Sequence, residues 1–238
     1  GGVVVGEGGV DFGSLAKYPL ATLAEVGIIA ALFKGLDVLG GAVGGLPAVF
    51  VPPLFAFLSL RSRVFSLLSA KRPPRGGFED AGKRVATPAD TKRPSWTPPG
   101  KFFPIIWLSI TALRSISAFI VWNAAGRTLC SAPLLALVAH LCVGDTWNSI
   151  TNVERRLGVS SLGVFFVLGS VFNAIYQFAC VKPLAGIILA PSAVWLSIAT
   201  VLTWSIWSLN GKQSLLPRKD GKAGTLQIPI FGSLMASK

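Results

Sequence analysis

The feature that most constrains this chain is a succession of long apolar segments that contain few charges. Five stretches of about 20 residues are predominantly apolar, which is the length an α-helix needs to cross roughly 30 Å of hydrocarbon. Charged residues make up 13% of the chain and the mean hydropathy is +0.63, whereas a soluble protein carries about 25% charged residues. The sequence therefore predicts an all-α membrane protein, a five-transmembrane-helix bundle with extra N-terminal and C-terminal segments.

The predicted spans cover residues 38–60, 103–123, 131–151, 161–181 and 185–209. They define a membrane domain at 36–210, which includes a long basic loop at 61–101 that is rich in Pro and Gly. An N-terminal extension at 1–35 holds one apolar segment of about a dozen residues, too short to span a bilayer. We therefore expect a short interfacial or docking helix there, and a basic C-terminal tail at 211–238.

The first predicted span contains closely spaced glycines and two adjacent prolines. Gly40 with Gly44, and Gly41 with Gly45, have the small-xxx-small spacing that lets a second helix approach closely. A flexible Gly-rich segment leading into the span explains the glycines equally well. The pair at 52–53, both Pro, predicts a kink.

Basic residues are distributed unequally between the two sides of a five-span topology. The chain has 22 basic and 10 acidic residues, a net charge of +12. The loop at 61–101, the connection at 152–160 and the C-terminal tail share one side and hold 17 of the 22 basic residues. The positive-inside rule places that side in the cytoplasm or stroma and the N-terminus opposite. Because basic residues flank apolar spans, we expect membrane lipids with anionic headgroups as partners, and no nucleic acid.

Polar side chains within the spans mark a candidate site, because a charge in hydrocarbon costs on the order of 2.5–3.5 kcal/mol. In the second predicted span, Trp107, Thr111, Arg114 and Ala118 share one helix face. The other spans add polar or aromatic faces with helical spacing: His140, Gly144 and Trp147; Ser170, Asn173 and Gln177; Pro191, Trp195 and Ala199. Such a set indicates either a small-molecule pocket or polar groups that satisfy one another between helices.

The only histidine of the chain, His140, has two interpretations. A neutral imidazole can ligate the metal of a haem or chlorophyll, which makes His140 a candidate axial ligand. The alternative is a hydrogen-bonded packing residue. A pair of Arg114 with Asp145 would similarly neutralise two charges between helices.

Signatures of enzymes and metal clusters are absent from the sequence. Cys130, Cys142 and Cys180 lack the spacing of metal ligands and fall in or beside apolar segments. The chain has no G-x-S-x-G, H-E-x-x-H, Walker or G-x-G-x-x-G motif. We therefore assign no catalytic residue and expect a protein that is not an enzyme.

Two stretches resemble a known family. The sequence "RPSWTPPGKFFPIIW" is similar to the start of the second helix in the TspO/MBR family, also called translocator proteins or tryptophan-rich sensory proteins. The matching residues are Pro94, Trp96, Pro98, Pro99 and Trp107. The sequence "APSAVWLSIATVLTWSIWSLN" resembles the fifth helix of that family through Pro191, Trp195, Ala199, Thr200, Trp207 and Asn210. Trp147 fits the tryptophan of the third helix.

The resemblance implies a five-helix bundle, often dimeric, that binds porphyrins, sterols or other hydrophobic ligands in a pocket open to the long loop. Trp107, Trp147 and Trp195 would line this pocket, and Trp96, Pro98 and Pro99 would form its lid. With the polar residues of the spans, the predicted ligand-binding set is Trp107, Thr111, Arg114, His140, Trp147, Trp195 and Ala199. The chain departs from the family pattern where Arg114-Ser115 replaces Met-Gly and Gly144 replaces Asn.

These observations predict a TspO-like membrane protein that binds a tetrapyrrole (porphyrin, haem or chlorophyll) or another hydrophobic ligand, with lipid around it. Alternatives are an accessory subunit of a larger, photosynthetic membrane complex and a tetrapyrrole-degrading enzyme. We expect an oligomer, or contacts with other membrane subunits through the first helix and the terminal extensions. The start without Met suggests an imported organellar protein, in the plastid thylakoid by preference and the mitochondrion as the alternative.

Overall fold

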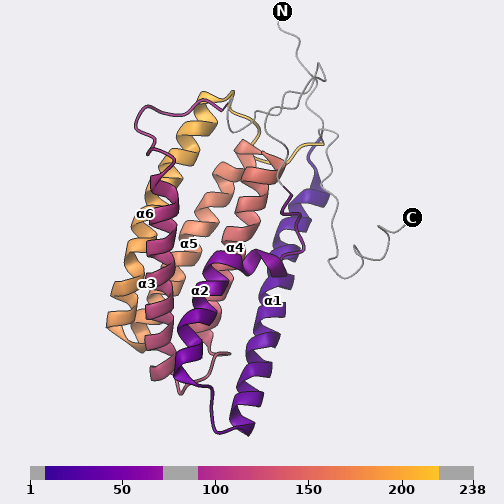
Figure 1. Cartoon of the computed structure of the whole chain (residues 1–238). Coiled ribbons are helices and arrows are strands. Elements are labelled where there is room, and N and C mark those ends of the chain that lie inside the picture. The colour runs from indigo at the N-terminus through magenta and orange to yellow at the C-terminus, as the bar shows by residue number, and fades with distance from the viewer. Residues whose placement is uncertain (1–8, 72–90, 220–238) are drawn as a thin grey trace, which may run out of the picture.

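In the computed structural model, residues 9–71 and 91–219 are described, and helices make up most of them (Figure 1). The six α-helices are α1 (Phe12–Ala42), α2 (Val51–Arg61), α3 (Phe102–Ala124), α4 (Ala132–Asn148), α5 (Leu157–Val181) and α6 (Pro183–Leu209). Two short 3-10 turns, η1 (Ala48–Phe50) and η2 (Ser62–Phe65), flank α2, and a π-helical turn, η3 (Ser149–Glu154), continues α4. The predicted all-helical class is confirmed for the described residues.

Four helical stretches are long and apolar enough to cross a membrane: Ala48–Phe65, Phe102–Ala124, Leu157–Val181 and Pro183–Leu209. They correspond to four of the five predicted spans. The fifth, predicted at 131–151, forms the 17-residue helix α4 and then the π-helical turn. The regular part of α4 is shorter than the roughly 20 residues that a span requires, so the count of five spans is not confirmed.

The first predicted span begins ten residues later than expected because the glycines form a turn. Gly44 and Gly45 have φ angles of 89° and 113°, a region that favours glycine because it has no Cβ. A Cβ on Gly40 would lie 2.8 Å from Leu46 Cγ, so this glycine allows the turn to fold back. The glycines thus separate α1 from α2 and do not line a helix pair. The two prolines lie in the first turn of α2, where the helix leaves N–H groups unused, so they remove no hydrogen bond from its interior.

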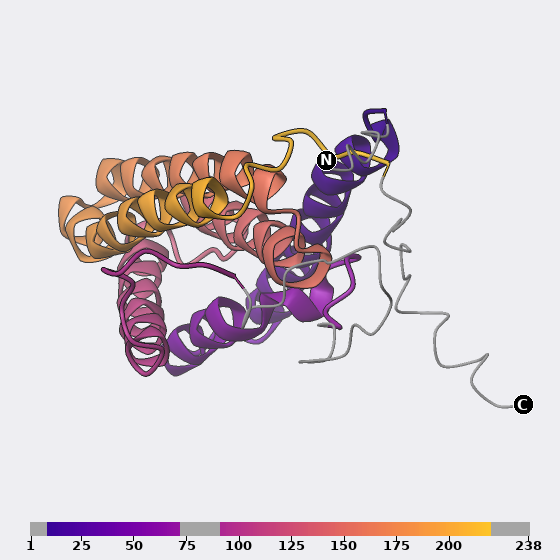
Figure 2. The ribbon, with the colours of Figure 1, turned by 90° about the horizontal axis from the view of Figure 1, so that it is seen from above.

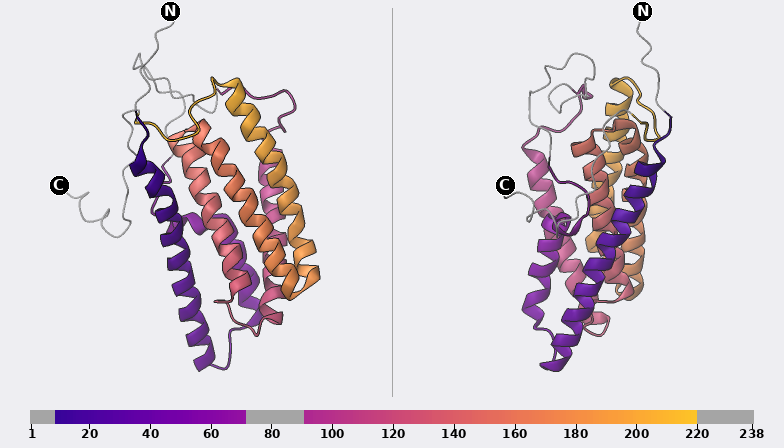
Figure 3. Two further views of the ribbon diagram at one scale, coloured as in Figure 1. Left: turned by 180° about the vertical axis from the view of Figure 1, so that it is seen from behind. Right: turned by 90° about the vertical axis from the view of Figure 1, so that its right-hand side faces the viewer.

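The helices pack in a ring-like order (Figure 2). α5 lies between α4 and α6, and α3 lies between α6 and α2. Direct packing of α3 against α4 and α5 is sparse. α1 lies on the outer side of α4 and runs along the full height of the bundle (Figure 3).

The N-terminal helix is longer than the dozen residues expected, because Glu25 does not interrupt it. Glu25 is fully buried and faces α4, whereas Leu20, Leu23 and Leu32 are exposed on the outer side. Tyr18, Ala21, Glu25, Ile29 and Phe33 form the buried stripe, at the 3–4 residue spacing of one helix face. The inward carboxyl group therefore leaves the outside of α1 apolar from Leu20 to Leu32, before the exposed Lys34.

The side predicted for the N-terminus is wrong. The backbone N–H of Asp11 donates to the carbonyl of Pro217 (2.7 Å), and that of Lys219 donates to the carbonyl of Gly9 (3.0 Å). The start of α1 therefore lies beside residues 217–219, at the same end of the bundle as residues 91–101 of the basic loop (Figure 1). Because α1 adds one traverse of the bundle, Lys17 joins the basic end and the charge asymmetry becomes stronger than in the five-span topology.

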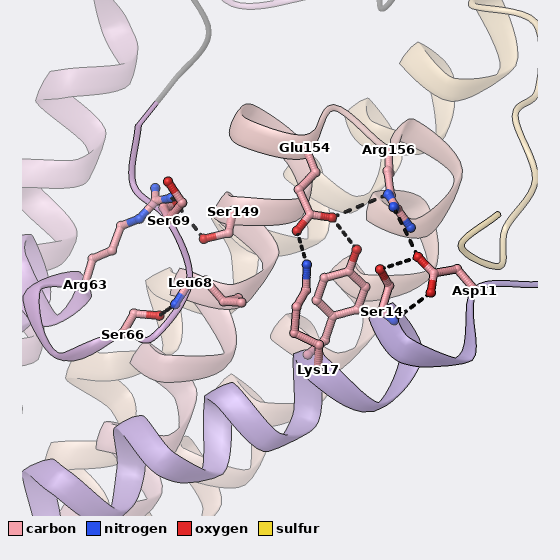
Figure 4. A network of polar contacts seen from close by, with 11 residues as sticks. Asp11, Ser14, Lys17, Arg63, Ser66, Leu68, Ser69, Ser149, Glu154 and Arg156 are labelled. Atoms are coloured by element: carbon pink, nitrogen blue, oxygen red, sulfur yellow. Dashed lines mark hydrogen bonds and ion pairs between the residues drawn. The ribbon is translucent and has the colours of Figure 1, made fainter. Parts of the chain in front are cut away.

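Charged side chains hold the first turns of α1 on the end of α4 (Figure 4). Glu154 accepts a hydrogen bond from Lys17 Nζ (2.7 Å) and another from the hydroxyl of Tyr18. Arg156 lies 3.4 Å from Glu154 and 3.5 Å from Asp11. Since Asp11 is also the N-cap of α1, the helix start is tied to the residues that connect α4 to α5.

Further contacts fix α1 at two lower levels. Thr22 Oγ1 lies 2.6 Å from Thr146 Oγ1 of α4. Near the other end, the two carboxylate oxygens of Asp37 accept the backbone N–H groups of Leu129 and Cys130, each at 2.8 Å. These N–H groups belong to the turn between α3 and α4, so α1 supplies hydrogen bonds that the turn lacks on its own.

The main apolar core fills the half of the bundle farther from the long loop. It joins the second half of α1, α2, the end of α3, the start of α4, the end of α5 and the start of α6. Phe33 and Phe55 meet edge to face with centroids 5.7 Å apart, and Trp122 is completely buried. The half nearer the loop contains most of the polar and indole side chains considered below.

The position of the N-terminus can be tested by labelling. In a background without the three native cysteines, we expect Gly9→Cys and Lys212→Cys to react with a membrane-impermeant maleimide from the same side of sealed vesicles. Thr128→Cys, in the turn between α3 and α4, is the matched control and should react from the opposite side. If Gly9→Cys reacts from the same side of the vesicles as Thr128→Cys, the arrangement is contradicted.

The N-cap predicts a response to acid. Hydrogen bonds from the Ser14 hydroxyl and backbone N–H hold the pKa of Asp11 below its ordinary value of 3.8, with a further contribution from Arg156. A lowered pKa gives stability that is complete above the ordinary value and is lost as the pH falls through the folded value. We expect amide protection factors for residues 12–18 to drop between pH 6 and pH 3, and to drop less in Asp11→Asn. Equal losses in both proteins would refute this role of the charge.

Candidate functional site

A chain of hydrogen bonds connects three helices halfway along the bundle. Arg114 Nη2 of α3 lies 2.8 Å from His140 Nε2 of α4, and His140 Nδ1 lies 2.9 Å from Ser170 Oγ of α5. Ser170 Oγ in turn donates to the carbonyl of Val167 at 2.8 Å. Arg114 is 4% exposed and His140 is 2% exposed, so the chain lies inside the bundle.

The direction of these hydrogen bonds follows from the chemistry of the groups. A guanidinium has only donors, so Nε2 of His140 must accept from Arg114. The proton of the neutral imidazole then sits on Nδ1, which donates a hydrogen bond to Ser170 Oγ. The Ser170 hydroxyl in turn donates a hydrogen bond to the carbonyl oxygen of Val167. The positive charge of Arg114 is therefore shared with a neutral acceptor and is not cancelled by it.

The alternative pair of Arg114 with Asp145 does not form. Within the described parts of the chain, the ion pairs involve Lys17, Arg156, Glu154 and Asp11, and no carboxylate lies within 4.0 Å of Arg114. Asp145 lies five residues after His140, which places it about 140° around α4 from the histidine. It consequently points toward η2, where it accepts a hydrogen bond from Ser62.

A second polar cluster, the η2 cluster, occupies the junction of α1, α4 and η2. Its acidic members, Glu25 and Asp145, face each other, and Glu25 makes no hydrogen bond of good geometry. Arg63 donates to Asn148 Oδ1 (2.7 Å) and to Ser149 Oγ (2.9 Å) at its edge. This cluster is not predicted from the sequence, because residues 1–35 are expected there to form an extension. The signal for it in the sequence is Glu25, which falls within the buried stripe of α1.

Trp147 is fixed against α5 by the π-helical end of α4. Its Nε1 donates to the carbonyl of Ser160 (3.0 Å), and Thr151 Oγ1 lies 2.6 Å from the Ser160 hydroxyl. A Cβ on Gly163 would lie 3.2 Å from the indole. π-helical turns often occur at functional sites, and here the turn aims both side chains at one residue of α5.

The other predicted indoles come from α3 and α6. Trp195 meets Phe103 edge to face at 5.7 Å, and its Nε1 is buried without a partner. Trp107 is 37% exposed and lies two turns from Arg114 on the same face of α3. Within the described residues, Trp107, Trp147 and Trp195 do not stack on one another.

The remaining residues of the predicted set line neighbouring positions. Thr111 is buried one turn from Arg114 and donates its hydroxyl proton to the carbonyl of Trp107 at 2.8 Å. Ala199 is half-buried on α6, one turn after Trp195. The structure thus joins Arg114 to His140 directly and places the other members on the surrounding helices.

The predicted lid segment is anchored to the end of α6. Asn210 accepts a hydrogen bond from the backbone N–H of Lys92 (2.9 Å) and donates one to its carbonyl (2.8 Å). Trp96 is 48% exposed, Pro98 is half-buried and Pro99 is exposed. The paired hydrogen bonds of Asn210 hold this segment next to the end of α6, just before the start of α3.

Ligation of a metal by His140 does not fit the structure. Both ring nitrogens are engaged, Nε2 by Arg114 and Nδ1 by Ser170. A metal ion would also be placed beside the positive guanidinium. Among the described residues, no group of three or more His, Cys, Asp or Glu side chains is arranged to hold a metal ion.

Open space lies beside the hydrogen-bonded chain. A Cβ built on Gly144 would meet no atom within 4 Å. Gly144 is one turn after His140 and one turn before Trp147, so all three share a face of α4. That face is directed toward α3 at His140, and α3 packs only sparsely on α4 and α5.

The sequence has relatives among known proteins. The sequence model of the TspO/MBR family matches residues 76–208. Protein CrtK of Rhodobacter capsulatus is 33% identical over 120 residues, which cover 50% of this chain and 75% of that protein. The translocator protein of Homo sapiens is 26% identical over 124 residues, 51% of this chain and 73% of that protein. The tryptophan-rich protein TspO of Bacillus cereus is 24% identical over 119 residues, 50% and 77% respectively.

The hydrogen-bonded chain makes a prediction about stability. Removing the acceptor of a buried charge costs about 3 kcal/mol, whereas removing a neutral hydrogen bond costs about 1 kcal/mol. We therefore expect His140→Leu to lower the unfolding temperature of the detergent-solubilised protein much more than Ser170→Ala. The double variant Arg114→Leu/His140→Leu should be more stable than His140→Leu alone. Additive losses in this double-mutant cycle would show that Arg114 and His140 are not coupled.

Proposed function

Because the chain belongs to the TspO/MBR family, we propose that this membrane protein binds a tetrapyrrole or another hydrophobic ligand between α3, α4 and α6. Five helices, α2 to α6, form the membrane domain in this proposal, with α4 and its π-helical turn as the fifth crossing. α4 supports this assignment because it connects a turn at one end of the bundle with the α1 anchor at the other (Figure 3).

The observation that carries the proposal is the open position at Gly144. It lies on the α4 face that holds His140 and Trp147. Direct packing of α3 against α4 and α5 is sparse. In this proposal, Trp107 of α3 and Trp195 of α6 line the part of the site nearer the long loop. Aromatic walls with few polar groups are typical of sites for small hydrophobic molecules, and an indole provides a flat surface on which a planar ligand can stack.

The ligand is held by contacts with the protein and not through a metal bond. Since His140 has no free nitrogen, a metal-free porphyrin suits the site as well as a metallated one. Binding energy then comes from burial of apolar surface, about 25 cal/mol per Å², and from polar contacts at the margin. The anchored segment that carries Trp96 lies at the end of the bundle from which a ligand would enter.

A second candidate function, an accessory subunit of a larger membrane complex, is favoured by the outer face of α1. Leu20, Leu23 and Leu39 are exposed there, on a helix that lies before the region matched by the family. Native gel electrophoresis of mildly solubilised membranes separates the two functions. Migration as a free monomer or dimer favours ligand binding, and co-migration with other subunits favours the complex.

Ligand binding can be tested by titrating the purified protein with protoporphyrin IX while recording tryptophan fluorescence. We expect saturable quenching, with at least fivefold weaker binding in Trp195→Phe and Trp147→Phe. Trp204→Phe is a matched control because Trp204 lies nine residues after Trp195, which at roughly 100° per residue puts it on the opposite face of α6. It packs on Phe165 and Trp207. Non-saturable quenching, or equal effects of all three substitutions, argues against the site.

A further inference from the structure

We propose that the ligand of this site is an anionic amphiphile, a hydrophobic molecule whose carboxylate group binds the guanidinium of Arg114. The inference rests on the proposed function and narrows it to one chemical class. It assigns to Arg114 the role of a ligand-binding residue, and it predicts that neutral analogues of the same molecule bind weakly.

Among the described residues, the positive charge of Arg114 has no opposite charge beside it. The side chain is 4% exposed, its Nη2 donates to a neutral imidazole, and its Nε has no hydrogen-bond partner. Taking an ion out of water costs several kcal/mol, and only an opposite charge with good hydrogen-bond geometry offsets that cost. Within residues 9–71 and 91–219, no carboxylate provides this at ion-pair distance.

The nearest acidic group is engaged elsewhere. Asp145 attracts Arg114 only at longer range, and it accepts its hydrogen bond from Ser62 on the other side of α4. Arg63 also competes for its charge. Rotation of Asp145 toward Arg114 would leave the Ser62 hydroxyl without its acceptor. Arg114 therefore remains available to an anion that enters the site from outside.

The guanidinium of Arg114 is held in position before a ligand arrives. The chain from Arg114 through His140 and Ser170 to the carbonyl of Val167 fixes one edge of the group. A guanidinium is planar and presents its five donors in a rigid fork, so an edge that is not used by His140 is suited to a carboxylate. A lysine could not do this, because its ammonium is a point charge without such a fork.

Helix α6 carries further buried hydrogen-bond donors. Trp195 Nε1 and Ser192 Oγ are both buried without a partner. They are three residues apart and hence lie on one face of the helix, the face that meets Phe103 of α3. A buried donor without an acceptor lowers the stability of the protein, because its desolvation is not compensated. A ligand that carries acceptor oxygens reduces this cost, whereas a pure hydrocarbon would not.

Space for the apolar part of the molecule lies next to the charge. The open position at Gly144 is one turn from His140, and Trp107 is two turns from Arg114 toward the loop. An amphiphile can therefore place its carboxylate at mid-height and its hydrophobic body between the indoles. The apolar core on the far side of Arg114, around Val121, Trp122 and Leu134, closes the site in the other direction.

The test compares an acid with its ester. Protoporphyrin IX carries two carboxylates, and its dimethyl ester has the same ring without charge. We expect wild-type protein to bind the free acid at least tenfold more tightly than the ester. In Arg114→Gln this preference should vanish, and in Arg114→Lys it should be reduced. Lys101→Gln, which removes an exposed positive charge at the start of α3, is the matched control and should keep the full preference.

The outcomes distinguish the two levels of the proposal. Equal binding of acid and ester by the wild type overturns the inference and leaves the hydrophobic site intact. Failure of both to bind overturns the proposed function and the inference with it. A preference that persists in folded Arg114→Gln also overturns the inference. Because the wild-type comparison needs no substitution, misfolding of a variant does not affect it.

Competition identifies the source of the carboxylate. Displacement of protoporphyrin IX by palmitate but not by methyl palmitate supports the inference with a fatty acid as ligand. Displacement by neither supports it with a carboxylated tetrapyrrole. Equal displacement by palmitate and its methyl ester contradicts a site that selects a negative charge.

Discussion

The arrangement of the bundle depends on one positive charge held inside an apolar structure. The side chain of Arg114 can leave the interior of the bundle only if α3 rotates and turns the other side chains of this face outward. His140 of α4 is its neutral hydrogen-bond acceptor, and Ser170 of α5 holds the imidazole in place. Three helices are thereby fixed at one height. In a medium of low polarity such a chain of hydrogen bonds is stronger than it would be in water, and it sets the register of α3, α4 and α5 more narrowly than apolar packing alone. The core lies on one side of this level and the candidate site on the other.

Polar contacts inside the bundle also position the N-terminal helix. α1 carries its polar side chains on the side that faces the bundle: Lys17 and Tyr18 at the top, Thr22 and Glu25 in the middle, Asp37 at the bottom. Ala21, Ile29 and Phe33 share this inner face, whereas Leu20, Leu23 and Leu32 lie on the outer one. With most of its polar side chains turned inward, a segment interrupted by charges becomes part of an apolar bundle. Polar contacts also have a defined direction, so they determine the position of α1 along α4 in a way that leucine packing would not.

Much of the fold could be predicted from the sequence because length and apolarity identify a spanning helix directly. The predicted spans at 103–123, 161–181 and 185–209 agree with α3, α5 and α6 within a few residues. The first span was misplaced because the glycines near residue 44 have the same spacing in a helix interface and in a turn, and only their φ angles separate the two. The N-terminal helix was underestimated because Glu25 ends an apolar run in the sequence although its side chain faces a carboxyl group on α4. At the site, helical spacing correctly put Arg114 and His140 within spans, but which of Asp145 and His140 meets the arginine depends on the rotation of α4 about its axis. That rotation is set by packing between helices, and a single sequence does not contain it in readable form.

The contact between the start of α1 and the segment after α6 has a consequence for the biogenesis of the protein. Asp11 is synthesised early, yet its backbone N–H group bonds to Pro217, which follows the last helix. Its ion-pair partner Arg156 also appears only after α4 is complete. During insertion, the carboxyl group of Asp37 and the charged groups at the start of α1 therefore lack their partners until the later segments are in place. Contacts that join the two ends of a chain are slow to form, so docking of α1 is a late step of assembly.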